Sequence, residues 1–219
     1  MSDVQQKKRF FRRWRLYPIA VLFALGAPAL FFFWYSGLLG INLRVVSPGK
    51  CYRSGQMPAL QLKKAIQENG IKCVINLRGA LSANWHQEEV LVCNDASISL
   101  VDIHLKLGEL PPPPLIEELA KHLETGPYPL LVHCYNGADR SSLASVLFLM
   151  LVQKQSLEMA LDSQMTWRQG HLKVGGAAAM DHFFDLYRQT GNGQDIKTWI
   201  TQSYPSVYDK ESHVTAAKN

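Results

Sequence analysis

The sequence has few cysteines, and outside its first fifteen residues it has no excess of charge of either sign. The four cysteines, Cys51, Cys73, Cys93 and Cys134, show neither metal-ligand spacing nor the paired pattern of a disulfide framework, so we expect no metal and no cofactor. Six of the 23 basic residues and one of the 18 acidic residues lie in the first fifteen positions, which leaves 17 of each in the rest. This balance gives no indication of nucleic-acid binding.

Charged residues are also absent from Leu16 to Leu43. The apolar part of this stretch, 17–35, is long enough to cross a bilayer, which takes about 20 residues. Its ends carry aromatic side chains that favour the membrane interface: Trp14, Tyr17, Trp34 and Tyr35. We therefore expect one transmembrane helix over 16–39. A cleaved signal peptide is the alternative, because 27–29 resembles a cleavage site, but the apolar region is longer than signal peptides usually have.

Basic residues lie mainly before this stretch. Six precede it, whereas only Arg44, Lys50 and Arg53 follow closely. Because the more basic flank of a span stays in the cytoplasm, we expect a cytoplasmic N-terminus, and a periplasmic body if the source is a Gram-negative bacterium. The chain then divides into a basic cytoplasmic segment (1–15), a transmembrane helix (16–39), a globular domain (42–190) and a polar C-terminal tail (191–219). In the tail we expect one or two turns at 195–203 and disorder at the end.

Apolar runs and turn residues alternate along 42–190. The pattern predicts strands at 43–46, 50–53, 71–77, 98–105 and 130–132, and helices at 59–69, 84–94, 115–124, 143–153, from Ser156 onwards, and 177–189. Strands that alternate with helices over short links favour the α/β class, with a mostly parallel central sheet flanked by helices.

The most informative stretch is 130–142, Leu-Leu-Val-His-Cys-Tyr-Asn-Gly-Ala-Asp-Arg-Ser-Ser. A short apolar strand leads into a tight loop and then into a long apolar helix. The N–H groups of such a loop and of the first helical turn converge on one point, where they favour an anion. There Cys134 is expected to be an ionised nucleophile at neutral pH, Arg140 can bind two phosphoryl oxygens, Gly137 permits the turn, and Ser141 can donate to the sulfur.

This stretch resembles the loop of the cysteine-dependent protein tyrosine phosphatases, which reads His-Cys, five residues, Arg, then Ser or Thr. The matching residues are His133, Cys134, Gly137, Arg140 and Ser141, while Ser142 stands where members usually carry Gly. The wider run 51–187 is similar to the compact dual-specificity branch, notably at 52–56 and 74–78. The resemblance implies a phosphatase domain over 42–190 that works through a phosphocysteine intermediate, with Cys134 as nucleophile and Arg140 holding the phosphoryl group.

The resemblance also implies a set of substrate-binding residues around this loop. They are His133, Tyr135, Asn136, Gly137, Ala138 and Ser141 in the loop region, and Arg53 and Arg78 outside it. For each of these two arginines a bland alternative has equal weight: Arg53 pairs with a surface acid, and Arg78 simply ends a strand. Among the other cysteines, Cys51 is the one that could approach Cys134 in a protective disulfide.

A phosphatase of this kind needs an acid to protonate the leaving oxygen and a base to activate water. Three carboxylates are candidates. Asp139 ranks first because it lies in the loop beside Arg140, a placement also seen in myotubularins. Glu109 follows, on the segment before the proline run 111–114. Asp102 ranks third because an acid within a strand more often has a structural role.

The favoured function is that of a membrane-anchored phosphatase acting on a phosphotyrosine or phosphoserine protein. A phospholipid or lipopolysaccharide headgroup is the alternative, favoured by an anchor that holds the site near the bilayer. A catalytically inactive phosphate-binding module is a second alternative, against which the intact Cys134 and Arg140 argue. A sulfurtransferase also places a cysteine before a helix, but the five-residue gap to Arg140 and the preceding His133 favour phosphate chemistry.

Overall fold

The computed structural model describes residues 26–28 and 41–216, with side chains described as far as residue 211. The first fifteen residues and nearly all of the predicted span 16–39 lie outside the described residues. Residues 26–28 form a piece of helix that belongs to a separate unit from the body that follows Leu38. Among the described helices, none combines the length and apolar character that a membrane span requires.

A five-stranded sheet forms the centre of the body, in the order β1-β2-β5-β3-β4. Strands β1 (Arg44–Ser47) and β2 (Cys51–Ser54) make an antiparallel hairpin. Strand β5 (Leu130–His133) runs parallel to both β2 and β3 (Cys73–Asn76), and β3 pairs in parallel with β4 (Ser99–Asp102). The predicted α/β class with a mostly parallel sheet is confirmed, and β5 is the middle strand.

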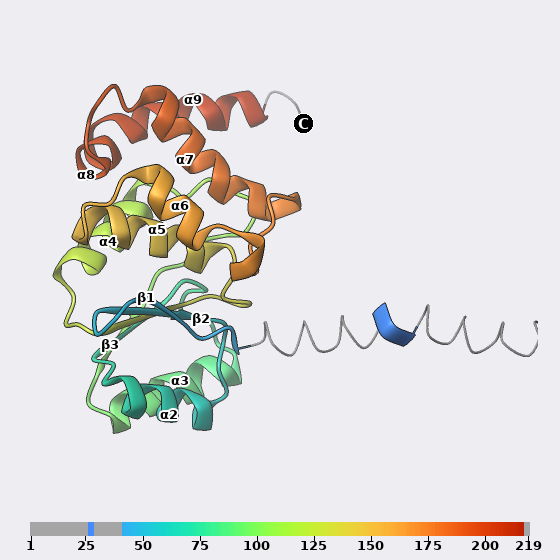
Figure 1. Cartoon of the computed structure of the whole chain (residues 1–219), viewed down its shortest axis with the longest axis vertical. Helices are drawn as coiled ribbons and strands as arrows, with labels where there is room; N and C mark the ends of the chain where they lie inside the picture. The colour runs from blue at the N-terminus through green and yellow to red at the C-terminus, as the bar shows by residue number, and fades with distance from the viewer. Residues whose placement is uncertain (1–25, 29–40, 217–219) are drawn as a thin grey trace, which may run out of the picture. The chain divides into compact units, whose positions relative to one another are not determined.

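Helices cover both faces of this sheet (Figure 1). Helices α2 (Ala59–Asn69) and α3 (Asn84–Asp95) lie on one face, and α4 (Pro113–Thr125), α5 (Arg140–Val152) and α6 (Leu157–Gln164) lie on the other. Helix α5 is buried along almost its whole length, which explains why its sequence is apolar on all sides. Ser156 caps α6 as predicted, since its side chain accepts a hydrogen bond from the backbone of Met159.

The C-terminal region is more ordered than predicted. Beyond α7 (Ala178–Thr190), the structure has α8 (Ile196–Thr198), a π-helical turn η3 (Trp199–Ser203) and α9 (Tyr204–Ala216). Trp199 and Tyr204 are fully buried, and the Tyr204 hydroxyl donates to the carbonyl of Pro111 at 2.7 Å. The one or two turns expected at 195–203 are confirmed. The disorder expected at the end is wrong for 204–216, because a few apolar side chains in a polar sequence suffice to fasten this stretch to the core.

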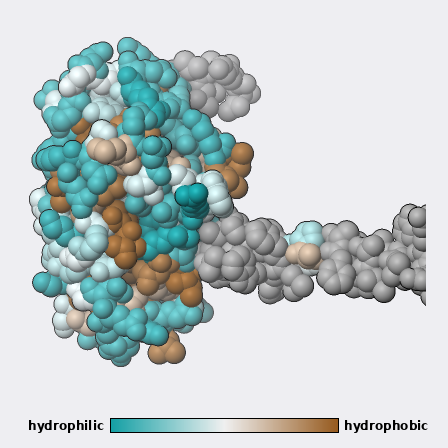
Figure 2. Space-filling view, viewed as in Figure 1, coloured by the Kyte–Doolittle hydropathy of each residue, from teal (hydrophilic) through white to brown (hydrophobic). Residues whose placement is uncertain are grey.

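The surface is mainly hydrophilic on the face shown in Figure 2, with hydrophobic side chains between the polar ones. Some large apolar residues outside the sheet and the longer helices remain exposed: Leu107, Tyr135, Trp167, Leu172 and Val174. Scattered exposed apolar groups are ordinary for a globular protein.

Candidate active site

The loop 134–139 joins the carboxyl end of β5 to the N-terminus of α5, where parallel sheets commonly bind their ligands. It packs against the end of β2, and Gly137 makes this possible. Gly137 has φ +64°, and a Cβ there would lie 2.4 Å from the backbone nitrogen of Gly55. No other residue fits without moving one backbone segment. The Tyr135 carbonyl accepts from the Gln56 N–H at 3.0 Å, which joins the same two segments.

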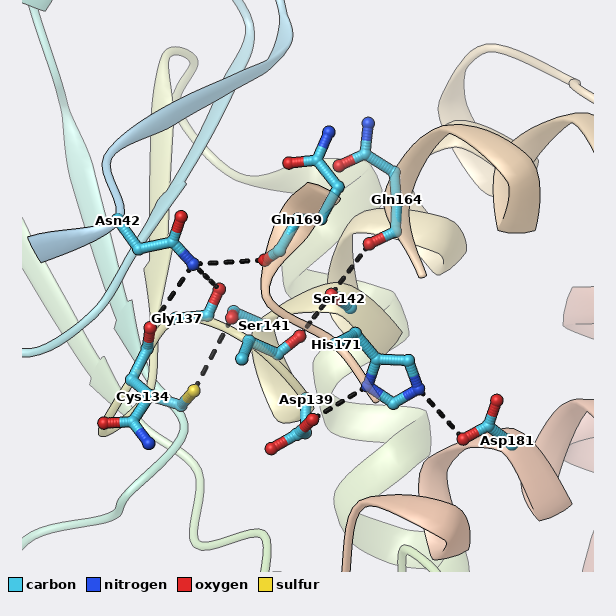
Figure 3. Close-up of polar contacts among 12 residues, drawn as sticks. Asn42, Cys134, Gly137, Asp139, Ser141, Ser142, Gln164, Gln169, His171 and Asp181 are labelled. Atoms are coloured by element: carbon cyan, nitrogen blue, oxygen red, sulfur yellow. Dashed lines mark hydrogen bonds and ion pairs between the residues drawn. The ribbon is translucent and has the colours of Figure 1, made fainter. Parts of the chain in front are cut away.

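The structure brings Cys134 and Ser141 together at the base of this loop. The sulfur of Cys134 lies 3.5 Å from the Ser141 hydroxyl oxygen, and the cysteine is only 3% exposed. Figure 3 shows the two side chains facing one another. A hydroxyl in this position can donate to a thiolate and so stabilise the sulfur as a nucleophile and as a leaving group.

Arg140 is the first residue of α5, and its side chain reaches the segments that follow β3 and β4. Its Nη1 donates to the carbonyls of Leu105 at 3.0 Å and Leu77 at 3.4 Å. Its Nε is buried and has no hydrogen-bond partner among the described residues. A buried guanidinium donor without a partner is costly unless an anion accepts from it, so this atom fits a phosphoryl group held by the loop.

His133 is buried next to a residue that the sequence reasoning missed. Its Nε2 lies 2.8 Å from a carboxylate oxygen of Glu89 on α3, and both side chains are 2% exposed. Its Nδ1 lies 3.4 Å from the carbonyl of Cys134. The ring therefore contacts the loop backbone on one side and a buried carboxylate on the other, which supports an orienting role. The sequence spacing could have indicated that Glu89 is buried, because it lies three and four positions before Val92 and Cys93 and so shares their buried helix face.

Arg53 does not pair with a surface acid, the bland alternative for it. It is completely buried, and its guanidinium donates to Ser142 Oγ at 2.6 Å, the Gln164 carbonyl at 2.9 Å and the Gln169 carbonyl at 2.7 Å. Burial, followed by repulsion from Arg44, lowers the pKa of Arg53 to about 10. Its three hydrogen bonds run to the first turn of α5, to the last residue of α6 and to the segment after α6, and its contact with substrate stays a prediction.

Ser142, which stands where the phosphatase loops that this stretch resembles usually carry Gly, lies at the centre of this arrangement. Its hydroxyl contacts the carbonyls of Ala138 and Gln164 while accepting from Arg53. Glycine at this position would leave Arg53 without that acceptor. The serine and the buried arginine therefore brace the loop from behind. Figure 3 shows Ser142 next to the Gln164 carbonyl.

Asn42 is a second brace that the sequence reasoning missed. Its side-chain amide nitrogen lies 2.8 Å from the Gly137 carbonyl, 3.3 Å from that of Asn136 and 3.2 Å from that of Gln169. Its oxygen accepts from Arg44 at 2.6 Å. The carbonyls of Asn136 and Gly137 thus point towards Asn42. This orientation leaves the loop N–H groups free to bind an anion.

Asp139, the first-ranked acid, is bonded to a histidine that no motif indicated. His171 lies 2.8 Å from Asp139 through Nδ1 and 2.9 Å from Asp181 of α7 through Nε2. Figure 3 shows the ring between the two carboxylates. Burial alone would lower the pKa of His171, but hydrogen bonds and charge from Asp139 and Asp181 outweigh burial and raise it.

The other two candidate acids lie in different surroundings. Glu109 is exposed and 3.4 Å from Lys106, on the loop after β4. Asp102 accepts from the Asn76 amide at 2.7 Å and lies 3.0 Å from His86. Because Asn76 also holds the turn at Arg78 and Gly79, Asp102 has the structural role that its place in a strand indicated.

Arg78 lies at the mouth of the site between two aromatic rings. Its guanidinium carbon is 3.8 Å from the ring centre of Trp85 and 5.0 Å from that of Tyr135, and Nη1 donates to Gln56 at 3.3 Å. Burial and the nearby charge of Arg140 lower the pKa of Arg78. Arg78 thus contacts the loop residue Tyr135, whereas the sequence placed Arg78 only at the border of the site.

The remaining cysteines are buried and free, and none is near Cys134 along the sheet. Cys51 pairs with Leu130, at the end of β2 opposite to the loop, whereas Ser54 pairs with His133. The considered disulfide between Cys51 and Cys134 is absent for this reason. Burial raises the pKa of Cys73 to about 11 and that of Cys93 to about 12, which makes these thiols poor nucleophiles.

Among the comparisons with known proteins, those with solved structures find matches, and these matches agree on the fold. No family model matches the chain, and no curated protein matches it significantly. Among solved structures, TpbA of P. aeruginosa has a TM-score of 0.51 at 20% identity, covering 65% of this chain and 88% of that chain. It is also known with a Cys-to-Ser substitution in complex with phosphotyrosine, at a TM-score of 0.51 and 19% identity over 66% of this chain and 89% of that one.

Two further solved structures have a similar fold. The core catalytic domain of the PP-IP phosphatase SIW14 from S. cerevisiae has a TM-score of 0.52 at 18% identity, over 71% of this chain and 94% of that chain. A glycine-to-alanine mutant form of Tk-PTP has a TM-score of 0.53 at 16% identity, over 67% and 97%. The described body therefore has the same fold as TpbA, the SIW14 phosphatase domain and Tk-PTP.

Proposed function

We propose that this chain is a membrane-anchored cysteine-dependent phosphatase that hydrolyses phosphomonoesters through a phosphocysteine intermediate. One arrangement carries the proposal: the buried Cys134 thiol lies beside the Ser141 hydroxyl, on a loop that leads into Arg140, whose buried Nε has no hydrogen-bond partner among the described residues. The fold of the neighbours, several of which are phosphatases, supports the same chemistry.

The reaction has two displacement steps. The Cys134 thiolate attacks phosphorus, an S–P bond forms, and the P–O bond to the leaving group breaks as that oxygen takes a proton from Asp139 or Glu109. Water then attacks the phosphocysteine and gives up a proton to the same carboxylate. An O–P bond forms, the S–P bond breaks, and Ser141 donates to the departing thiolate. Arg140 and the loop N–H groups hold the equatorial oxygens throughout.

A phosphotyrosine or phosphoserine protein is the first substrate class. Arg78 supports it, because a guanidinium between Trp85 and Tyr135 offers both charge and flat apolar surface to an aromatic phosphoester. TpbA in complex with phosphotyrosine supports it by analogy.

A lipid headgroup carrying a phosphomonoester is the second class. The observation that favours it is Asn42, which bonds to the loop backbone and follows the end of the predicted span by only three positions. The anchor itself, with a cytoplasmic N-terminus and a periplasmic catalytic domain, is part of the proposal. An alkaline phosphatase fused after Asn219 tests this topology: activity supports it, and silence contradicts it.

The decisive experiment uses the purified full chain in detergent. We expect hydrolysis of p-nitrophenyl phosphate, which Cys134→Ser abolishes while phosphate binding persists. Cys93→Ser is the matched control, because it removes a buried thiol that lies on α3 and not in the loop. Rates on a phosphotyrosine peptide, a phosphoserine peptide and phosphatidic acid vesicles then decide between substrate classes. Hydrolysis that survives Cys134→Ser would refute the proposed nucleophile.

A further inference from the structure

Three hydrogen-bonded side chains, called the row below, extend from the loop to helix α7: Asp139, His171 and Asp181. Asp139 belongs to the loop, His171 to the segment between η1 (Trp167–Gln169) and η2 (Gly175–Ala177), and Asp181 to the first turn of α7. The two hydrogen bonds are 2.8 and 2.9 Å long. The imidazole side chain is 2% exposed, and the carboxylates of Asp139 and Asp181 are 21% and 16% exposed.

The two hydrogen bonds require two protons in the row. Either His171 carries both as an imidazolium between two carboxylates, or it is neutral, donates from Nε2 to Asp181 and accepts at Nδ1 from a protonated Asp139. Both arrangements have the same net charge of minus one. They differ only in which atom of the Asp139–His171 hydrogen bond holds the proton, so its transfer between the two groups changes neither the net charge nor the number of hydrogen bonds.

The charges around the row favour keeping both protons. Asp139 and Asp181 are the charged groups that act on the ring, and together they outweigh its burial and raise the pKa of His171. Arg53, behind the loop, interacts electrostatically with Asp139 but makes no hydrogen bond to it in the described structure. A lone aspartic acid would lose its proton near pH ~3.9, whereas the row keeps a transferable proton next to Asp139 near neutral pH.

We propose that His171 and Asp181 are positioning residues that supply Asp139 with the proton it delivers to the leaving oxygen. This inference rests on the phosphatase function proposed above and chooses Asp139 over Glu109 as the group that exchanges protons with substrate. Asp181 holds the ring in the orientation in which Nδ1 faces Asp139, as the buried carboxylate does in other histidine-carboxylate pairs.

The proton balance closes over one catalytic cycle. In the first step the leaving oxygen takes one proton from Asp139, and the row is left with a single proton, held between His171 Nε2 and Asp181. The lone pair at Nδ1 then faces an ionised Asp139. In the second step the attacking water gives one proton to Asp139, which restores the two-proton row as the S–P bond breaks and the thiolate is regenerated.

The test compares two leaving groups in the full-length enzyme as a function of pH. Phenyl phosphate has a poor leaving group that needs protonation, whereas p-nitrophenyl phosphate needs it far less. For His171→Gln we expect kcat on phenyl phosphate to fall about 10²-fold near neutral pH, the scale of general acid catalysis. On p-nitrophenyl phosphate it should fall less than about fivefold, with KM little changed. The basic limb of the phenyl phosphate profile should move to lower pH.

Asp181→Asn should move the same limb in the same direction by a smaller amount, because it removes one of the two carboxylates that raise the pKa of His171. Asp185→Asn is the matched control, since it removes a carboxylate one turn further along α7 that pairs instead with Lys173 and Arg188. It should leave the profile where it is. Glu109→Gln should also leave the leaving-group dependence unchanged.

Two results would overturn the proposal: an unmoved basic limb in both His171→Gln and Asp181→Asn, or equal losses on the two substrates. If His171→Gln does not fold, as judged by its thermal melt, the Asp181→Asn profile decides alone. Failure of the phosphatase function would look different. The wild-type enzyme would then fail to hydrolyse p-nitrophenyl phosphate, or Cys134→Ser would retain activity.

Discussion

Replacing Arg53 tests whether its hydrogen bonds behind the loop stabilise the folded protein by more than the burial of its charge destabilises it. Burial, followed by Arg44, lowers the pKa of this side chain from 12.5 to about 10, which corresponds to about 3 kcal/mol against the charged form. Its three hydrogen bonds, to Ser142, Gln164 and Gln169, are 2.6 to 2.9 Å long. At about 1.5–3 kcal/mol for each bond from a charged donor, they contribute about 5–9 kcal/mol.

The difference predicts that Arg53→Met lowers the free energy of unfolding by about 2–6 kcal/mol. For a protein of this size that is a fall in Tm of about 5–20 °C, measurable by tryptophan fluorescence on the full chain in detergent. Arg53→Lys should be no more stable than Arg53→Met. An ammonium keeps the cost of burial but lacks the planar fork that reaches both carbonyls.

Lys50→Met is the control, because it removes a positive charge from an exposed residue just before β2. It should leave Tm within about 2 °C of the wild-type value, as ordinary surface changes do. The reasoning is refuted if Arg53→Met is as stable as the wild type, or if lysine restores stability. Either result would mean that charge alone, and not the set of three bonds, determines the role of this arginine.

The remaining predictions concern the loop and its histidine. Gly137→Ala should lower kcat on p-nitrophenyl phosphate at least about 10²-fold, because its Cβ meets backbone at 2.4 Å; Gly49→Ala, with a similar φ of +68° and open space, should remain active. Asn42→Ala should lower the free energy of unfolding by about 1–3 kcal/mol, measured by chemical denaturation, since buried loop carbonyls lose their donor. Since the pKa of folded His171 is raised, its contribution to stability is complete below pH ~6.5 and is lost as pH rises through the raised pKa. A Tm profile should show that fall, and His171→Gln should lack it.

Local sequence was enough to predict the sheet and the loop. Leu130 to Val132 had to be buried, and the Cys134-to-Arg140 spacing placed a thiol and a guanidinium at one helix N-terminus. Such features depend on neighbours within about ten positions, where strand and helix periods act. The buried helix α5 was equally clear, because an uninterrupted apolar stretch has no other place in a globular domain.

The braces could not be predicted in this way because their partners are far apart in sequence. Asn42 bonds to Gly137 across 95 positions and Arg53 to Ser142 across 89. Buried polar pairs leave no periodic trace, since each side chain alone looks like a surface residue. His171 was missed for the same reason: its two carboxylates lie on other elements, 32 and 10 positions away.

The residues around the loop therefore form two groups, one behind the loop and one at the mouth of the site, and the sequence alone did not distinguish them. Behind the loop, Asn42 and Arg53 share the Gln169 carbonyl as an acceptor, so a change in either is transmitted to the other and to the loop backbone. At the front, Arg78 contacts Tyr135 and Trp85 but makes no bond to the braces. Substitutions of Asn42 or Arg53 should consequently lower both kcat and the stability of the fold, and kcat should change on every substrate. Arg78→Ala should instead change KM selectively, more for a phosphotyrosine peptide than for p-nitrophenyl phosphate, with little change in Tm. Equal effects on both substrates would mean that Arg78 only supports the loop, and that the choice of substrate is made elsewhere on its rim.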